Sequence, residues 1–433
     1  MKHAVVFGLV LILAQSLISA PLVFVREDGN DSSNGLSWAE AKATIPAALN
    51  IADAGGEVRV SNGTYIVTAP ITVATNVWLH SVNGPELTTL DAANATNALI
   101  YVNHADATVA GFTFKNVKCG PQRAHAALHL ASGTVTNCII RDNTANTVSP
   151  VYVTGGLLID SVVTNNLVND YYGAAGLLIT GGTVRHCRIV KNTSNNRSSN
   201  TAGVQQEGGT VADCFIVGNS GPSMAEGNGN AAAGVRMTGG LLERCVIACN
   251  TNTWDGYSAA GGLYVFGSGT VRNCLIAGNR AQRNSTDVAA GLTITASGAL
   301  VENVTVVDNT NPNSTADGIR IKDGTLRNAI AWNNGADAVD NLNQSGGTVT
   351  YSCFPTAVEG DGNHNQAGAP VFRNAAAGDY RLTPEARSCI NRGYTASWGP
   401  GDKDLAGDKR ISGRFCDIGA YEYQYRGTTL VLR

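Results

Sequence analysis

The chain is poor in charge. Only 15% of its 433 residues are Asp, Glu, Lys or Arg, the formal net charge is −3, and no basic run occurs. Phosphate binding needs a positive footprint, so nucleic acid is not an expected partner. After residue 22 no stretch is long and apolar enough to span a bilayer, so we expect no transmembrane segment in the mature chain.

The motifs of the well-known enzyme classes are also missing. There is no G-x-S-x-G, H-E-x-x-H, P-loop or dinucleotide fingerprint. Asp28 and Asn30 stand in DGNDSSNG, where side chains with oxygen atoms occur at alternate positions. An EF-hand loop needs glycine at its sixth and glutamate at its twelfth position, and here these are Ser33 and Ala39. A turn explains the segment better, with Asp28 and Asn30 kept as candidate Ca²⁺ ligands. No cofactor is expected, with Ca²⁺ as the alternative.

The N-terminus predicts export. Lys2 is a short positive region, and the apolar stretch from Ala4 to Leu13 is too short for a mature anchor. We therefore assign residues 1–20 to a signal peptide, with cleavage between Ser16 and Leu22. The predicted location is outside the cell or on its surface.

What the chain does have is glycine, 50 residues of it, and much of this glycine stands in a repeat. The copies can be anchored on Gly133, Gly156, Gly182, Gly209, Gly240, Gly269, Ala299, Gly324 and Gly347. Their spacings are 23, 26, 27, 31, 29, 30, 25 and 23 residues. Ten residues after each of the first eight anchors stands an asparagine: Asn143, Asn166, Asn192, Asn219, Asn250, Asn279, Asn309 and Asn334.

Each copy reads as strand, glycine turn, strand, asparagine turn and variable loop. Repeats of this length stack, and the lack of helical periodicity excludes helical and leucine-rich solenoids. We predict an all-β, single-stranded right-handed parallel β-helix, with a cap helix within LSWAEAKATIPAALNIADAGG and a loop-rich C-terminal cap that seals the other end. We expect the N-terminal cap to span residues 21–70, the coils residues 71–350 and the C-terminal tail residues 351–433. The protein is expected to be a monomer.

Stacked coils align like residues into ladders. The asparagines then form a purely structural amide ladder, because each amide can donate and accept between coils. Five residues after the anchors stand Cys138, Ser161, Cys187, Cys214, Cys245, Cys274, Val304 and Ala329. Cysteine alternates there with small core residues, which predicts buried free thiols rather than disulfides or metal ligands. A further row of alternating charge, predicted to be solvated, contains Glu243, Arg272, Glu302 and Arg327.

Three cysteines lie beyond the regular column: Cys353, Cys389 and Cys416. Among these, Cys389 and Cys416 form the pair that we predict as a disulfide.

Both ends of the chain resemble known proteins. The N-terminal segment FVREDGNDSSNGLSWAEAKATIPAALNIADAGGEVRVSNGTY resembles secreted bacterial right-handed parallel β-helix repeat proteins of the pectate-lyase-like superfamily. The C-terminal segment DYRLTPEARSCINRGY…DLAGDKRISGRFCDIGAYEY is similar to their choice-of-anchor Q tail. The repeats also resemble those of polymorphic outer-membrane proteins. The resemblance implies the fold, secretion and a polysaccharide on one strand face; it is weak for chemistry.

The variable loops all lie between the asparagine turn and the next strand, along one edge of one face. They contain Tyr171, Tyr172, Trp254, Asp255 and Tyr257. The adjacent strands point outward with His129, Tyr152, Leu178, Gln205, Arg236, Tyr264, Thr293 and Arg320. Aromatic and cationic side chains beside long loops are typical of a groove for an extended ligand, with sugar faces stacking on the rings.

Two main functions follow from this face. The first is binding of an extended carbohydrate without catalysis, and the second is a polysaccharide lyase, less expected as a glycoside hydrolase. Arg320, Lys322 and Arg236 are the candidate catalytic residues, but Arg236 lies three coils from Arg320, and we see no carboxylate pair on the face. A structural repeat protein without ligand is a third alternative.

Overall fold

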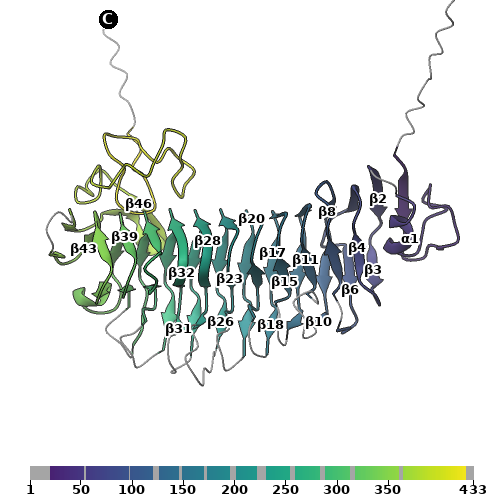
Figure 1. The fold of residues 1–433 in the computed structure, drawn as a ribbon, viewed down its shortest axis with the longest axis horizontal. Coiled ribbons are helices and arrows are strands. Elements are labelled where there is room, and N and C mark those ends of the chain that lie inside the picture. The colour runs from purple at the N-terminus through teal and green to yellow at the C-terminus, as the bar shows by residue number, and fades with distance from the viewer. Residues whose placement is uncertain are drawn as a thin grey trace, which may run out of the picture.

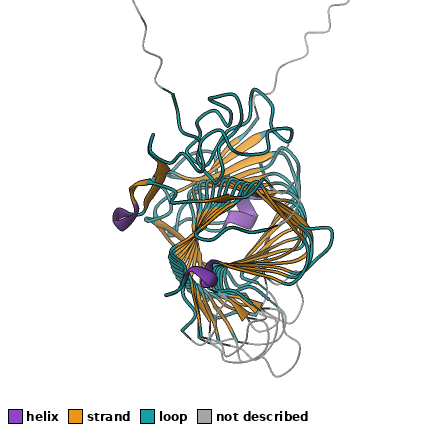
Figure 2. Cartoon of the chain, turned by 90° about the vertical axis from the view of Figure 1, so that its left-hand side faces the viewer, coloured by secondary structure: helices purple, strands orange, loops and turns teal. Residues whose placement is uncertain are grey.

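The structure is a computed structural model that describes residues 20–52, 55–96, 98–119, 126–145, 149–169, 173–195, 201–221, 231–253, 259–282, 288–312, 317–359 and 364–425. It is a long rod of stacked coils, which confirms the predicted parallel β-helix (Figure 1). Seen along the rod, the strands of successive coils lie over one another as walls around a shared interior (Figure 2). The predicted signal peptide lies outside the described residues, except for Ala20.

Four columns of stacked strands run along the rod. Two long strands, β28 (Val235–Glu243) and β32 (Leu263–Arg272), each belong to both the first and the second column. The first column also contains β4 (Ile71–Val73), β7 (Ile100–Val102), β11 (Leu128–Leu130), β15 (Val151–Val153), β19 (Leu177–Ile179), β23 (Val204–Gln206), β35 (Leu292–Ile294), β38 (Ile319–Ile321) and β41 (Leu342–Gln344). The second also contains β1 (Leu22–Val25), β2 (Gly56–Val60), β5 (Val77–Ser81), β8 (Thr108–Ala110), β12 (Thr134–Thr136), β16 (Leu157–Ile159), β20 (Thr183–Arg185), β24 (Thr210–Ala212), β36 (Leu300–Glu302), β39 (Thr325–Arg327) and β42 (Thr348–Thr350).

The third column contains β3 (Gly63–Ile66), β6 (Thr88–Asp91), β9 (Thr113–Lys115), β13 (Ile139–Arg141), β17 (Val162–Thr164), β21 (Arg188–Val190), β25 (Phe215–Val217), β29 (Val246–Ala248), β33 (Leu275–Ala277), β37 (Thr305–Val307), β40 (Ile330–Trp332), β43 (Cys353–Phe354) and β44 (Gln366–Ala367). The fourth contains two-residue strands: β10 (Lys118–Cys119), β14 (Thr144–Ala145), β18 (Leu167–Val168), β22 (Thr193–Ser194), β26 (Ser220–Gly221), β30 (Thr251–Asn252) and β34 (Arg280–Ala281). Outside the columns are β27 (Ala231–Ala232) paired with β31 (Ala259–Ala260), and β45 (Phe372–Asn374) paired with β46 (Asp379–Leu382).

The corners of a coil depend on residues with positive φ. In the coil that begins with β19, Gly182 has φ +73°, and a Cβ on it would lie 2.5 Å from the carbonyl carbon of Gly155 in the coil before. Only glycine fits such a turn. His186 and Lys191 adopt φ 51° and 56° at the next two corners. The chain therefore bends between Val184 and Cys187. Such a bend is expected from the sequence, because these two core positions stand three residues apart.

The asparagine ladder is confirmed along its whole length. Each amide donates from Nδ2 to the Oδ1 of the asparagine in the next coil, at 2.8 to 3.1 Å. Asn334 continues the ladder to Asn341, at 2.9 Å. The eight predicted asparagines are 0 to 1% exposed, so the ladder supplies the hydrogen bonds that these buried groups require.

The cysteine column is confirmed, whereas the predicted pair Cys389 and Cys416 is not bonded in this structure. Cys187 and Cys214 are buried free thiols at the predicted register, and burial raises the pKa of Cys138 to about 12. Cys389 and Cys416 are also free. The Cys416 thiol donates to the carbonyl of Tyr394 at 3.2 Å, and the Cys389 thiol packs instead in a cluster with Cys353.

The N-terminal cap helix is present but short. α1 (Ile45–Leu49) is capped by the Thr44 side chain and starts with a proline in its first turn. Ile45 and Ala48 are buried in the main core. Strand pairing begins before the predicted coil region, because β1 already pairs in parallel with β2, and β2 with β5.

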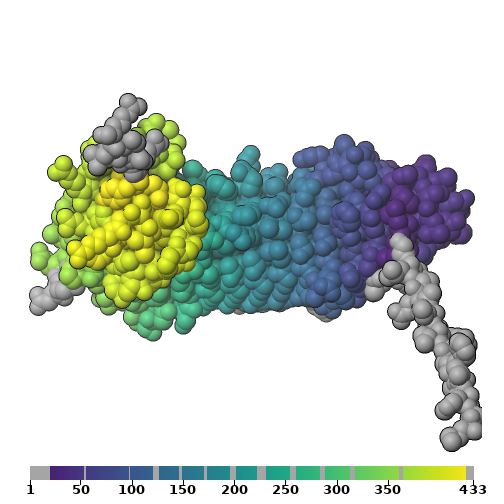
Figure 3. Space-filling view, turned by 90° about the horizontal axis from the view of Figure 1, so that it is seen from above, coloured from purple at the N-terminus to yellow at the C-terminus, as the bar shows by residue number. Residues whose placement is uncertain are grey.

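The predicted tail covers the end of the rod only with its first residues, and most of it lies against the side of the rod (Figure 3). Asn273, Asn303 and Asn328 stand in one corner of successive coils and donate to tail carbonyls, each at 2.9 Å. The end itself is covered by residues 354–358, where Phe354 and Val358 pack against the core. The tail thus hydrogen-bonds to the corners of the last coils.

The row of alternating charge is also covered by the tail rather than solvated. Glu243 and Arg272 form an ion pair at 2.9 Å, and Arg327 is 2.8 Å from Glu302 in the same row. The Arg272 guanidinium lies 5.4 Å from the ring centre of Trp398, a tail residue. The row therefore serves as part of the surface on which the tail docks. In the described part of the chain, no helix could cross a membrane.

Candidate functional site

The predicted face exists as one continuous row on the outside of the first column, which we call the outer row. The strand register joins Tyr101, His129, Tyr152, Leu178, Gln205, Arg236, Tyr264, Thr293, Arg320 and Asn343, in this order. The structure thus brings together all eight predicted strand residues. It adds Tyr101 and Asn343, which lie in coils where the repeat is less regular. The loop residues Tyr171, Tyr172, Trp254, Asp255 and Tyr257 lie outside the described residues.

Exposure divides the outer row. Tyr101, His129 and Tyr152 are half-buried, and so is Arg236. The remaining predicted positions are under 10% exposed: Leu178, Gln205, Tyr264, Thr293 and Arg320. A ligand that approaches from solvent therefore meets the N-terminal part of the outer row first.

The N-terminal part of the outer row is a stack of three half-buried rings, one from each of three successive coils. The ring centres of Tyr101 and His129 are 4.7 Å apart, and those of His129 and Tyr152 are 4.9 Å apart. The planes are tilted by 33° and 22°, so the rings lie face to face along the rod. Burial lowers the pKa of His129, so its imidazole is neutral at pH 7 and offers one donor and one acceptor.

Arg236 lies among polar and aromatic side chains. Its guanidinium is 5.7 Å from the ring centre of Phe266, which itself is 6.0 Å from the ring of Tyr264. Gln205 donates to Glu207 at 2.7 Å. Burial lowers the pKa of Arg236, but an arginine remains a cation at pH 7.

Arg320 has a structural role in this structure. Its Nη1 donates to Oδ1 of Asn343 at 2.8 Å and to the Asn343 carbonyl at 3.2 Å. The register confirms that Tyr264 and Thr293 separate Arg320 from Arg236, so the two arginines cannot act on one bond. Lys322 follows β38 and is half-buried.

A carboxylate pair, which sequence reasoning missed, lies beside the end of the outer row. Asp317 and Asp340 line a hollow of about 440 Å³ together with Arg280, and we call it the carboxylate hollow. A Cβ on Gly335 would collide with Oδ2 of both aspartates, so the two carboxylates converge over this glycine. Burial, and to a smaller extent the charge of Asp340, raises the pKa of Asp317 to about 6.

The sequence contained a signal for this pair. Asp317 and Asp340 each stand two residues before a strand of the first column, and these strands pair at Ile319 and Leu342. At the same position earlier coils carry small residues: Ala126, Ser149, Ala175, Ala202, Ala233, Gly261 and Ala290. Aligning the strands of the first column would have revealed two aspartates where the other coils have Ala, Ser or Gly.

The candidate Ca²⁺ ligands have other partners. Asp28 accepts from the Arg26 guanidinium at 3.0 and 2.6 Å, and this hydrogen bond lowers the pKa of Asp28. Asn30 accepts from the backbone of Ser32 at 2.9 Å. These are turn contacts, and the residues that the structure describes contain no group of three or more His, Cys, Asp or Glu that could hold a metal.

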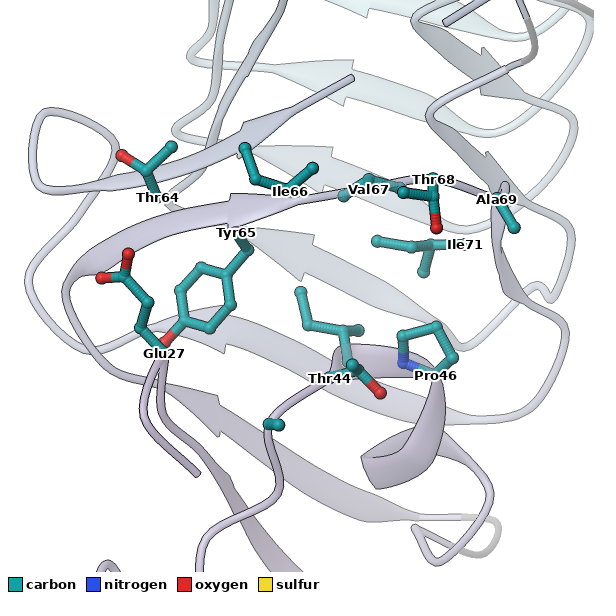
Figure 4. Close-up of a pocket in the computed structure, with 12 residues that line it drawn as sticks. Glu27, Thr44, Pro46, Thr64, Tyr65, Ile66, Val67, Thr68, Ala69 and Ile71 are labelled. Carbon is teal, nitrogen blue, oxygen red and sulfur yellow. The ribbon is translucent and has the colours of Figure 1, made fainter. Parts of the chain in front are cut away.

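A second cavity of about 390 Å³ lies at the N-terminal end of the rod (Figure 4). It is bounded by the start of α1 and by the segment from Thr64 to Ile71, with Glu27 and Tyr65 on one side. The Tyr65 hydroxyl is 3.0 Å from Ser61. The cavity is a seam between the cap and the first coils and does not touch the outer row.

No family model matches the chain, and no curated protein matches it. Several solved structures, in contrast, are similar to this chain. XylC in complex with xylose is 9% identical, with a TM-score of 0.51 over 94% of this chain and 99% of that chain. Pectate lyase Pel9A is 14% identical, with a TM-score of 0.49 over 93% and 96%. A mutant of the PL6 family alginate lyase AlyGC is 15% identical, with a TM-score of 0.42 over 80% and 55%. At such identities a likeness shows the fold alone, and the chain folds as a parallel β-helix.

Proposed function

We propose that this chain is a secreted or cell-surface protein that binds an extended carbohydrate along the outer row. The observation that carries the proposal is the stack of Tyr101, His129 and Tyr152 on successive coils. The similar fold of XylC, which was solved in complex with xylose, supports a sugar as the ligand. The N-terminal sequence supports export.

The ring stack changes how a sugar is expected to bind. The ring faces are turned toward one another, so a chain of sugars that lies along the rod meets their edges. Those edges carry two phenol hydroxyls and an imidazole nitrogen, which donate and accept hydrogen bonds. We therefore expect recognition of sugar hydroxyls by hydrogen bonds, rather than the stacking of sugar faces on aromatic rings. Arg236 is the cation of the row that can pair with a uronic acid.

Affinity electrophoresis in gels that contain pectate, alginate or neutral glycans tests the proposal. The change is the double substitution of His129→Ala and Tyr152→Ala. Because each lost hydrogen bond contributes about 1 kcal/mol, we expect affinity for the retained glycan to fall by roughly tenfold or more. Phe215→Ala is the matched control, because Phe215 is an exposed aromatic residue on the third column. Equal retention of both variants would refute binding at this row.

The carboxylate hollow favours a second candidate function, cleavage of an acidic polysaccharide. A carboxyl with a pKa of about 6 can hold a proton near neutral pH, and Asp340 places a second carboxyl group beside it. Incubation with polyuronates, followed by ultraviolet absorbance of unsaturated products and by a reducing-sugar assay, would detect a lyase or a hydrolase. Activity should disappear in Asp317→Asn and persist in Asp106→Asn, an exposed carboxylate in an earlier coil. Silence on all substrates would leave binding as the function.

A further inference from the structure

Two cysteine thiols meet where the tail joins the rod. Cys353 belongs to β43, the third-column strand of the last regular coil, and pairs in register with Ile330. Its neighbour Phe354 packs into the core, so by strand alternation Cys353 points out of the rod. Cys389 belongs to the tail. Both are 0% exposed and share one apolar cluster with Ile330 and Ile418.

Hydrogen bonds hold the two sulfur atoms around the same carbonyl. Cys353 Sγ donates to the Gly368 oxygen at 3.1 Å. Ser388 Oγ also donates to that oxygen at 3.3 Å and lies 3.8 Å from Cys389 Sγ. The Ser388 hydroxyl thus connects the Gly368 carbonyl to the Cys389 sulfur, and both thiols lie in one buried cluster. The stacking of the coils does not bring them together, since Cys353 belongs to a strand of the rod and Cys389 to the tail.

We propose that Cys353 and Cys389 form a disulfide in an oxidising compartment, and that this bond ties the tail covalently to the last coil of the rod. The bond would join a rod strand to a segment that otherwise docks by hydrogen bonds and apolar contacts. The proposal does not depend on the ligand of the outer row.

The other cysteines are less suited to this bond. Cys416 donates to the Tyr394 carbonyl at 3.2 Å and accepts from Asn328 at 3.6 Å, so its sulfur is engaged at a rod corner. In the cysteine column, residues such as Cys187 and Cys214 stack in register. Their Cβ atoms are then separated by about the coil spacing of 4.8 Å, beyond the roughly 3.5–4.5 Å of a disulfide, and continuous sheets keep the coils at that spacing.

The bond can form by exchange with a low-molecular-weight disulfide. The Cys353 thiolate attacks one sulfur of the small disulfide, forms a mixed disulfide and releases one small thiolate. Cys389 then loses its proton and attacks the Cys353 sulfur, which breaks the mixed bond and releases the second small thiolate. Two protein thiols are oxidised, and one small disulfide is reduced to two thiols that take up the two protons.

Peptide mapping of the full chain tests the proposal. The reduced protein is incubated with oxidised glutathione, quenched in acid, alkylated and digested with trypsin without reduction. The three cysteines separate, because Cys353 falls in the peptide of residues 328–373, Cys389 in residues 388–392 and Cys416 in residues 415–426. We expect a linked peptide that joins 328–373 to 388–392, and a loss of two of the ten thiols.

Because both thiols are buried, the reaction must wait for the tail to open, and dilute urea should accelerate it. Cys416→Ser is the matched control and should retain the link, while Cys389→Ser should remove it. A link between Cys389 and Cys416, a link within the cysteine column, or mixed disulfides with glutathione alone would each overturn the proposal.

Discussion

Substitution of one asparagine in the ladder tests how the rod is held together. Asn219 is fully buried, and its Oδ1 accepts from both the backbone and the side chain of Asn192, each at 3.0 Å. Its Nδ2 donates to the Ile189 carbonyl at 2.9 Å and to Asn250 at 3.0 Å. Asn219→Ala removes these four bonds.

The magnitude follows from the groups that lose a partner. The Asn192 N–H and the Ile189 carbonyl stay buried without the Asn219 side chain, and each such group costs about 1–3 kcal/mol. We therefore expect the free energy of unfolding to fall by about 4 kcal/mol. The assay is urea unfolding followed by far-ultraviolet circular dichroism, with the slope compared to confirm that the same surface unfolds.

The matched control is Asn195→Ala in the preceding coil. Asn195 is exposed and makes one long side-chain contact, 3.4 Å to Asn169. Its loss should change stability by less than about 0.5 kcal/mol, as is usual for surface substitutions. If Asn219→Ala and Asn195→Ala unfold at the same urea concentration, the ladder does not stabilise the rod and the reasoning is wrong.

Further predictions concern the tail and the thiols. Burial raises the pKa of Glu422 to about 7 and of Asp417 to about 6, so the folded state keeps protons that the unfolded state releases. The free energy of unfolding should therefore rise as pH falls from 8 to 6. A denaturation midpoint that stays constant over this range would contradict the prediction. Arg410 is fully buried and pairs with Glu422 at 3.0 Å, so Arg410→Met leaves buried carboxylates uncompensated and should cost about 3–5 kcal/mol, read by Trp398 fluorescence. In the native reduced protein, only Cys249 is exposed and should react quickly with a thiol reagent, whereas denaturant should release all ten thiols.

The sites differ in how far they could be predicted. The outer row was predictable because His129, Tyr152 and Arg236 keep one offset within the repeat. Its burial was not predictable, since exposure depends on what covers each strand. The aspartates of the carboxylate hollow follow the same register, but Asp317 and Asp340 were missed because only two coils carry them.

The rod follows from the repeat in the amino-acid sequence. Gly182, Asn192 and Cys187 recur at fixed offsets, and stacking converts a fixed offset into a ladder of neighbouring residues. The way in which the tail attaches is visible only in the folded chain. Cys389 was expected to pair with Cys416, yet it lies against Cys353 of the last regular coil. The physical reason is that tail contacts join segments far apart in sequence without periodicity, so no repeated spacing in the chain records them.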